Sequence, residues 1–175
     1  MKVCKFGGSS LSSTEEFKKV KDIVLSDKER QVIVVSAMGK RNPSDNKVTD
    51  LLYLIFQHAK YHVDFTIHFD EIKRRYLQVR DELSLNLNLE KQFEDLRRKI
   101  DDSEISEAEL VSRGEYFSAE LLSCYLGYDF VDSKDLIAFS YDGKIDEEKT
   151  LRQIKESFLV HPKMVVPGFY GSYPN

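Results

Sequence analysis

The sequence predicts an α/β fold of three layers (α/β/α), in which a mostly parallel central sheet lies between helices. Three short apolar runs have the length and the boundaries of strands: Val3–Phe6, Gln31–Val35 and Lys163–Val166. Between them, apolar residues recur at the three- and four-residue spacing of helices. Strands that alternate with helices are typical of a parallel sheet, because each crossover helix packs on a face of that sheet.

The first part of this pattern contains the clearest elements. Ser13 and Glu16 have the spacing of a capping box, which predicts that a helix begins there. The run Gln31–Val35 has apolar residues on both faces, as expected for a central strand that is covered on each side.

Residues 50–100 are predicted to form a helical insertion between strands. Residues 63–69 alternate like a strand, but the longer pattern from Phe69 to Leu83 repeats like a helix, and we therefore predict a helix. A connector over 83–89 and a short helix over 89–100 complete the insertion.

The last third of the chain returns to alternating elements. A helix from about Ser106 is predicted to end at Gly127, because glycine is common just after a helix. Short strands are predicted over 128–131 and 136–139, and Asp146 begins the next helix.

The composition indicates one soluble globular domain. The chain has 175 residues, a net charge of −4 and a charged content of 32%. A negative charge argues against nucleic acid or an anionic membrane as a partner. No apolar run reaches transmembrane length, and the two cysteines are spaced for neither a metal nor a disulfide framework. We therefore expect no metal site in the chain and a cytoplasmic location.

A glycine turn follows the first predicted strand. Gly7 and Gly8 lack a Cβ atom, so their N–H groups can approach phosphate oxygens, and Lys5 adds a positive charge at the end of the strand. The turn matches neither the P-loop nor G-x-G-x-x-G, and two glycines after a strand usually mean only a tight turn. A phosphate site therefore needs support from elsewhere in the sequence.

Three further motifs provide that support, because they also fall at predicted strand or helix ends. They are Val34–Ala37 with Val48–Asp50, Ser112–Glu115, and Pro167–Ser172. Together with Lys5–Ser10 they resemble the aspartokinases of the amino-acid-kinase superfamily, over essentially the whole chain. The resemblance implies the reaction of that family, which phosphorylates the side-chain carboxylate of L-aspartate with ATP and gives aspartyl phosphate.

The resemblance also implies roles at the phosphate side of the site. Lys5, Gly7 and Gly8 match catalytic residues that contact the transferring phosphoryl group. Together with Ser9, a hydroxyl beside the transfer site, they also match the positions that bind the ATP phosphates. ATP is the implied cofactor, and Mg²⁺ is expected to accompany the nucleotide.

Four residues match substrate-binding positions of the family. Ser36 and Thr49 match hydrogen-bonding positions, Glu115 matches the acid that pairs with the α-ammonium of aspartate, and Phe169 matches an aromatic residue of the pocket. Each of the last three also has a plainer interpretation. Thr49 would then be only a helix cap, Glu115 an exposed helix acid, and Phe169 a core residue.

The resemblance covers only part of the family's length. Its members continue to an Arg-Gly-Gly-Ser-Asp stretch, a nucleotide half and regulatory domains, so residues 1–175 match the N-terminal, amino-acid-substrate half of the catalytic domain. We expect such a segment to fold, to be inactive alone and to self-associate through an unpaired sheet edge. Two alternatives stay open: a non-catalytic aspartate-binding or interaction module, and a kinase for a related acidic amino acid.

Overall fold

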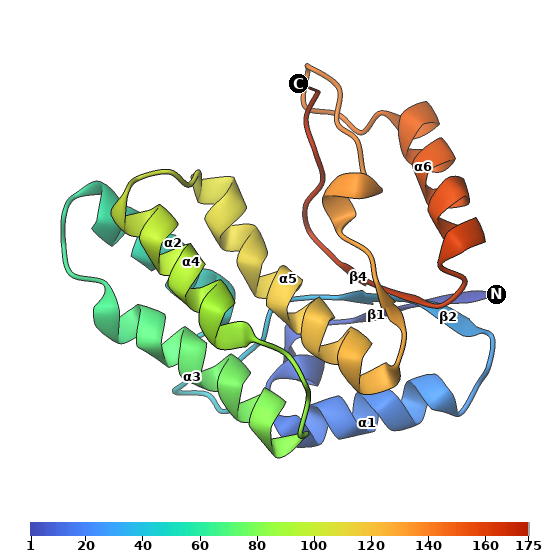
Figure 1. The fold of residues 1–175 in the computed structure, drawn as a ribbon, viewed down its shortest axis with the longest axis horizontal. Coiled ribbons are helices and arrows are strands. Elements are labelled where there is room, and N and C mark those ends of the chain that lie inside the picture. Colours follow the sequence, from blue (N-terminus) through green and yellow to red (C-terminus); the bar gives the residue numbers. More distant parts are fainter. Residues whose placement is uncertain (175) are drawn as a thin grey trace.

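The computed structural model describes residues 1–174, and within them the strands form one parallel sheet (Figure 1). The strands are β1 (Lys2–Phe6), β2 (Arg30–Val35), β3 (Asp129–Phe130) and β4 (Met164–Pro167), in the order β1-β2-β4-β3. All three strand pairings are parallel. The predicted α/β fold class is therefore confirmed.

The central strand β2 separates two apolar layers. Its side chains alternate, so that Ile33 and Val35 lie in the main core while Val32 and Val34 face the opposite side of the sheet. Helices α1 (Thr14–Leu25) and α5 (Glu107–Leu126) cover the first face, and α6 (Glu147–Val160) lies over the second (Figure 1). This arrangement gives the three layers that the sequence predicts.

The helix ends follow the local chemistry of the sequence. The Ser13 hydroxyl accepts a hydrogen bond from the Glu16 N–H at 3.4 Å and caps α1. Gly127 ends α5 with φ at +68°, a left-handed conformation that favours glycine. Asp146 caps α6, as the sequence predicts.

The insertion is helical, as predicted, and it forms the left part of the molecule in Figure 1. It contains α2 (Val48–Lys60), α3 (Thr66–Glu82) and α4 (Leu89–Asp101). Buried aromatic rings of α3, α4 and α5 hold it to the rest of the core: Tyr76, Phe93 and Phe117 lie with ring centroids 4.5–6.1 Å apart.

Two of the predicted strands are corrected by the structure. Residues 136–139 do not form a strand, because the N–H groups of Leu136 and Ile137 both donate to the Ser133 carbonyl, at 3.1 and 2.8 Å, and wind the chain into a turn. Only isolated bridges form at Ala138 and Phe139. The strand predicted over 128–131 is limited to the two residues of β3.

None of the helices formed by residues 1–174 has the length and apolar character needed to cross a membrane.

Candidate functional site

The glycine turn after β1 lies against the loop that follows β2. The Ser36 N–H donates to the Phe6 carbonyl at 3.1 Å, and the Gly39 N–H donates to the Gly8 carbonyl at 2.8 Å. Both segments leave the carboxyl end of neighbouring parallel strands, which is where open α/β sheets bind ligands. Ser36 and Gly39 therefore lie at the same edge of the sheet as the glycine turn.

The two glycines of the turn serve different purposes. A Cβ atom on Gly8 would lie 2.9 Å from the Ala37 carbonyl oxygen, and one on Gly39 would lie 2.5 Å from the Gly8 carbonyl carbon. Glycine is therefore required at both positions for the turn and the loop to pack. A Cβ atom on Gly7 would meet nothing within 4 Å, so the backbone there faces open space.

A cavity of about 420 Å³ lies at this edge of the sheet. Four separate segments line it, and they bring together five of the residues that the sequence singles out: Gly8, Ser9, Ser36, Thr49 and Glu115. The remaining walls come from the loop after β2: Ala37, Met38, Gly39, Lys40 and Lys47.

The structure does not place the other three predicted site residues in the wall of this cavity. Lys5 is exposed at the end of β1, and Gly7 is exposed just beyond it. Phe169 has a φ of +80° and 70% of its surface exposed, so it is not the core residue of the plainer interpretation.

Glu115 is the buried charge of the cavity. Only 5% of its surface is exposed, and its Oε2 atom has no hydrogen-bond partner within residues 1–174. Burial raises the pKa of the Glu115 carboxyl above its ordinary value of 4.5, while the backbone N–H of Ala37 opposes the shift. A buried carboxylate with an unused oxygen is suited to bind a cation, which would restore its missing interactions.

The helix that carries Glu115 is held closely against the loop after β2. At Gly114 a Cβ atom would lie 2.7 Å from the Ala37 Cβ, so the glycine allows the close contact. The buried Tyr76 hydroxyl donates to the Gly114 carbonyl at 2.8 Å. Glu115 is therefore not the exposed helix acid of the plainer interpretation.

The polar groups facing Glu115 come from the loop after β2 and the start of α2. The residue before α2 is Lys47, which makes no side-chain cap, so Thr49 lies inside the first turn and is not the helix cap. Lys40 and Lys47 were missed by the sequence reasoning. In a loop rich in Asn, Pro and Ser, lysines have the same sequence signature as solvated surface residues.

A comparison with models of protein families shows which family the chain belongs to. The model described as "Amino acid kinase family" matches residues 1–175. The chain belongs to the amino acid kinase family. Aspartokinase 3 of Bacillus subtilis is 29% identical over 98% of this chain and 40% of its own length. The chloroplastic aspartokinase 2 of Arabidopsis thaliana is 34% identical over 71% of this chain and 24% of its own length. The chain therefore spans 40% or less of these curated relatives.

Solved structures agree with this assignment. The crystal structure of Clostridium acetobutylicum aspartate kinase superposes with a TM-score of 0.94 at 42% identity, over 98% of this chain and 39% of that chain. Escherichia coli aspartokinase III in complex with aspartate and ADP superposes with a TM-score of 0.78 over 98% of this chain and 41% of its own. At 20% identity, the second match shows the fold alone.

Proposed function

We propose that this chain forms the amino-acid-substrate half of an aspartate kinase. The reaction would be the ATP-dependent phosphorylation of the L-aspartate side-chain carboxylate, the first step of lysine, threonine and methionine biosynthesis. The observation that carries the proposal is the cavity beside the glycine turn, which is lined by Ser36, by Thr49 and by the buried, incompletely paired Glu115. The likeness to the aspartate kinase of Clostridium acetobutylicum supports it.

The cavity offers each charged part of aspartate a different partner. Its α-ammonium group would pair with Glu115, since a charge-assisted hydrogen bond there replaces the interactions that burial removed. Carboxylate oxygens would accept hydrogen bonds from the hydroxyl groups of Ser36 and Thr49, which line the same space. The site would thus fix the orientation of the substrate before phosphoryl transfer.

The phosphate side of the site would lie at the glycine turn. ATP, when bound, supplies the phosphoryl group. The open space at Gly7 fits a close approach by phosphate oxygens, and the Ser9 hydroxyl lies in the adjoining cavity wall. Lys5 would place its ammonium group near the transferred phosphoryl group, where it would offset the negative charge of the transition state.

The residues present do not fit a protein-held metal. Within residues 1–174, no group of three or more His, Cys, Asp or Glu side chains is placed to hold one. We propose that Mg²⁺ comes with the nucleotide and is held by its phosphates.

The cytoplasm is the proposed location, and the free thiols of Cys4 and Cys124 are compatible with it. We also propose that these residues alone turn over no ATP, since Lys5 and Gly7 face solvent.

Calorimetric titration of the 175-residue chain with aspartate tests the substrate assignment. Glu115→Gln should weaken aspartate binding by about 2 kcal/mol, because an uncharged amide loses the charge-assisted contact. Glu120→Gln is the matched control: Glu120 is also a largely buried carboxyl group on α5, but it does not line the cavity. Equal affinities for wild type and Glu115→Gln would contradict the proposal. Tighter binding of glutamate than of aspartate would favour a kinase for a related amino acid.

A further inference from the structure

The loop between β2 and α2 is fixed by an arginine from the helical insertion. Arg75 on α3 has only 2% of its surface exposed. Its guanidinium group donates to the carbonyl of Gly39, and to that of Asn46 at 2.8 Å. It also lies 3.8 Å from the Asp45 carboxylate. One buried side chain therefore holds both ends of the loop.

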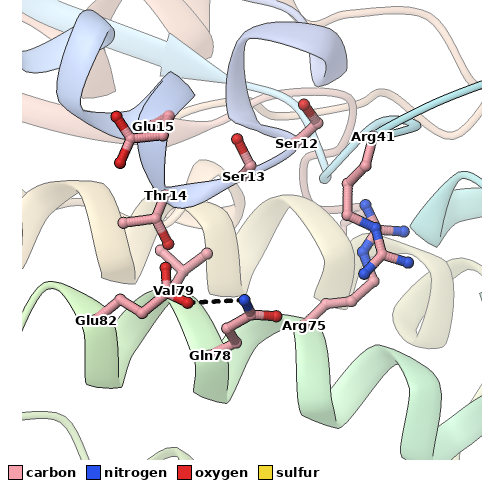
Figure 2. Close-up of a pocket in the computed structure, with 9 residues that line it drawn as sticks. All are labelled: Ser12, Ser13, Thr14, Glu15, Arg41, Arg75, Gln78, Val79 and Glu82. Atoms are coloured by element: carbon pink, nitrogen blue, oxygen red, sulfur yellow. Dashed lines mark hydrogen bonds between the residues drawn. The ribbon is translucent and has the colours of Figure 1, made fainter.

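A second arginine stabilises the loop from within. Arg41 donates from Nε and Nη2 to the two carboxylate oxygens of Asp45, at 2.7 and 2.8 Å. This contact holds the pKa of Asp45 well below its usual range, so that the carboxylate stays charged between the two arginines. Figure 2 shows the guanidinium groups of Arg41 and Arg75 together, between the loop and α3.

The two carbonyl groups that Arg75 binds belong to the residues just before the cavity lysines. Gly39 precedes Lys40, and Asn46 precedes Lys47. Fixing these carbonyls fixes the points where both lysine side chains leave the backbone. Lys40 and Lys47 are the lysines in the cavity wall, and no arginine within residues 1–174 lines it. The rigid loop therefore supplies the positive charge of the cavity.

The start of α2 adds to this positive side. The Val48 N–H donates to the Met38 carbonyl at 3.1 Å, which holds the first turn of the 13-residue helix beside the cavity. The Lys47 side chain at the N-cap accepts no hydrogen bond from the first turn of the helix. The N-terminus is the positive end of the helix dipole, so the dipole adds to the positive charge of the two lysines. The buried Glu115, with its unpaired oxygen, independently marks this space as a ligand site with a negative side.

We propose that Lys40 and Lys47 form an anion-binding pair for the side-chain carboxylate of a dicarboxylic amino acid, with Arg75 as the residue that positions them. The inference rests on the proposed function and identifies which residues make the site selective for a substrate with two carboxylates. Since Gly39 binds the Gly8 carbonyl, the pair lies next to the glycine turn, where the carboxylate that accepts the phosphoryl group has to be. Glu115 holds the ammonium group of the same substrate.

Titration of two ligands into matched variants tests the pair. Lys47→Gln should weaken the binding of aspartate about tenfold, the size expected for a hydrogen bond to a charged group. The same change should leave asparagine, which lacks the side-chain charge, within about twofold of its wild-type affinity. Lys40→Gln should behave in the same way. Lys60→Gln, an exposed lysine at the other end of α2, should change neither affinity.

Arg75 is tested through its coupling to the lysines. In an Arg75→Met background, aspartate binding should be weak and Lys47→Gln should weaken it no further, because the lysine is no longer held at the cavity. An effect of Arg75 on stability alone would leave the full Lys47→Gln effect in place. If Arg75→Met does not fold by circular dichroism, the lysine variants decide.

The remaining results of these titrations would each contradict a specific part of the proposal. Equal losses for aspartate and asparagine would show that the lysines do not bind the side-chain carboxylate. Unchanged aspartate binding in both lysine variants would overturn the pair and leave the proposed function intact. No aspartate binding by the wild-type chain would overturn the proposed function, and this inference with it.

Discussion

At the scale of single residues, the proposed role of Glu115 carries a cost in stability. Its carboxylate is buried beside the backbone N–H groups of Ala37 and of Glu115 itself, and it keeps an oxygen without a partner within residues 1–174. An ionised carboxylate in such a place destabilises the free protein, because burial removes its hydration. A bound ammonium group would restore the lost interactions, so the same residue favours the complex over the free chain.

Stability measured against pH should report this effect. The folded-state pKa of Glu115 is raised by burial, so its contribution to stability is fully present below the unfolded pKa, and it is lost as pH rises through the folded pKa. Without ligand, Glu115→Gln should therefore melt higher than wild type at pH 7, and the difference should vanish below about pH 4.

Thermal unfolding of both proteins across this pH range checks the prediction. Glu120→Gln should show a difference of the same sign, since burial also raises the pKa of Glu120. At the same concentration and at pH 7, aspartate should raise the melting temperature of wild type and of Glu120→Gln clearly more than that of Glu115→Gln. A difference between Glu115→Gln and wild type that does not vary with pH would contradict the explanation.

At the scale of elements, α3 supports two walls of the cavity at once. Arg75 binds carbonyl groups of the loop after β2, and the next residue, Tyr76, donates to the Gly114 carbonyl of α5. These residues lie in the helical insertion, away from the strand ends where the motifs gather. The insertion therefore positions the site in addition to enlarging the core.

The contact between α5 and the loop should tolerate no added atom at Gly114. Alanine there would place its Cβ 2.7 Å from the Ala37 Cβ, and neither atom can rotate away. We expect Gly114→Ala to destabilise the fold by about 2 kcal/mol through overpacking, despite the roughly 1 kcal/mol by which alanine favours a helix.

Denaturant unfolding and aspartate titration measure this change. Moving α5 should also shift Glu115, so the affinity for aspartate should fall with the stability. Cys124→Ala, an exposed position on the same helix, should leave both unchanged. A Gly114→Ala variant as stable as wild type would show that the loop can move aside.

How far the sequence predicts the site depends on whether a residue's role is local. Ser36 follows a predicted strand, so the chain order alone could place it at the sheet edge of the glycine turn, whereas Thr49 was assigned to the site only by the resemblance. Arg75 could not be placed in this way, because it stands in the run Lys73-Arg74-Arg75, whose charges resemble those of a solvated helix surface. Its burial results from packing of α3 against a loop that ends about thirty residues earlier in the sequence.

How well the sequence predicts the secondary structure also depends on whether the deciding contacts are visible in the local pattern. Helices with long apolar periodicity were predicted correctly, since many residues contribute to each pattern. The strand predicted over 136–139 was wrong because Ser133 captures two of its N–H groups, a contact that apolar periodicity does not report. Short elements are decided by such single contacts.

At the scale of the whole molecule, the two faces of the sheet are covered unequally. The face toward α1 and α5 is closed, whereas beside α6 an apolar hollow of about 700 Å³ remains on the other. Its walls are almost entirely apolar, and they include Val3, Val32, Val34, Leu159, Met164 and Val166. β1 is also an edge strand of the sheet. An apolar face beside the open edge of a sheet favours association with another copy or another surface.

We therefore expect the 175-residue chain to associate with itself as its concentration rises. Val3 is 61% exposed and lies on β1 in the wall of the hollow, so Val3→Lys would place a charge on both the apolar face and the sheet edge. Natural sheets block edge pairing in this way. Sedimentation velocity at several concentrations should show dimers or larger species for wild type and mainly monomer for Val3→Lys. Ile67→Lys is the control, since Ile67 is 79% exposed on α3, outside this hollow. A monomeric wild type, or an equal effect of both variants, would exclude association through this face.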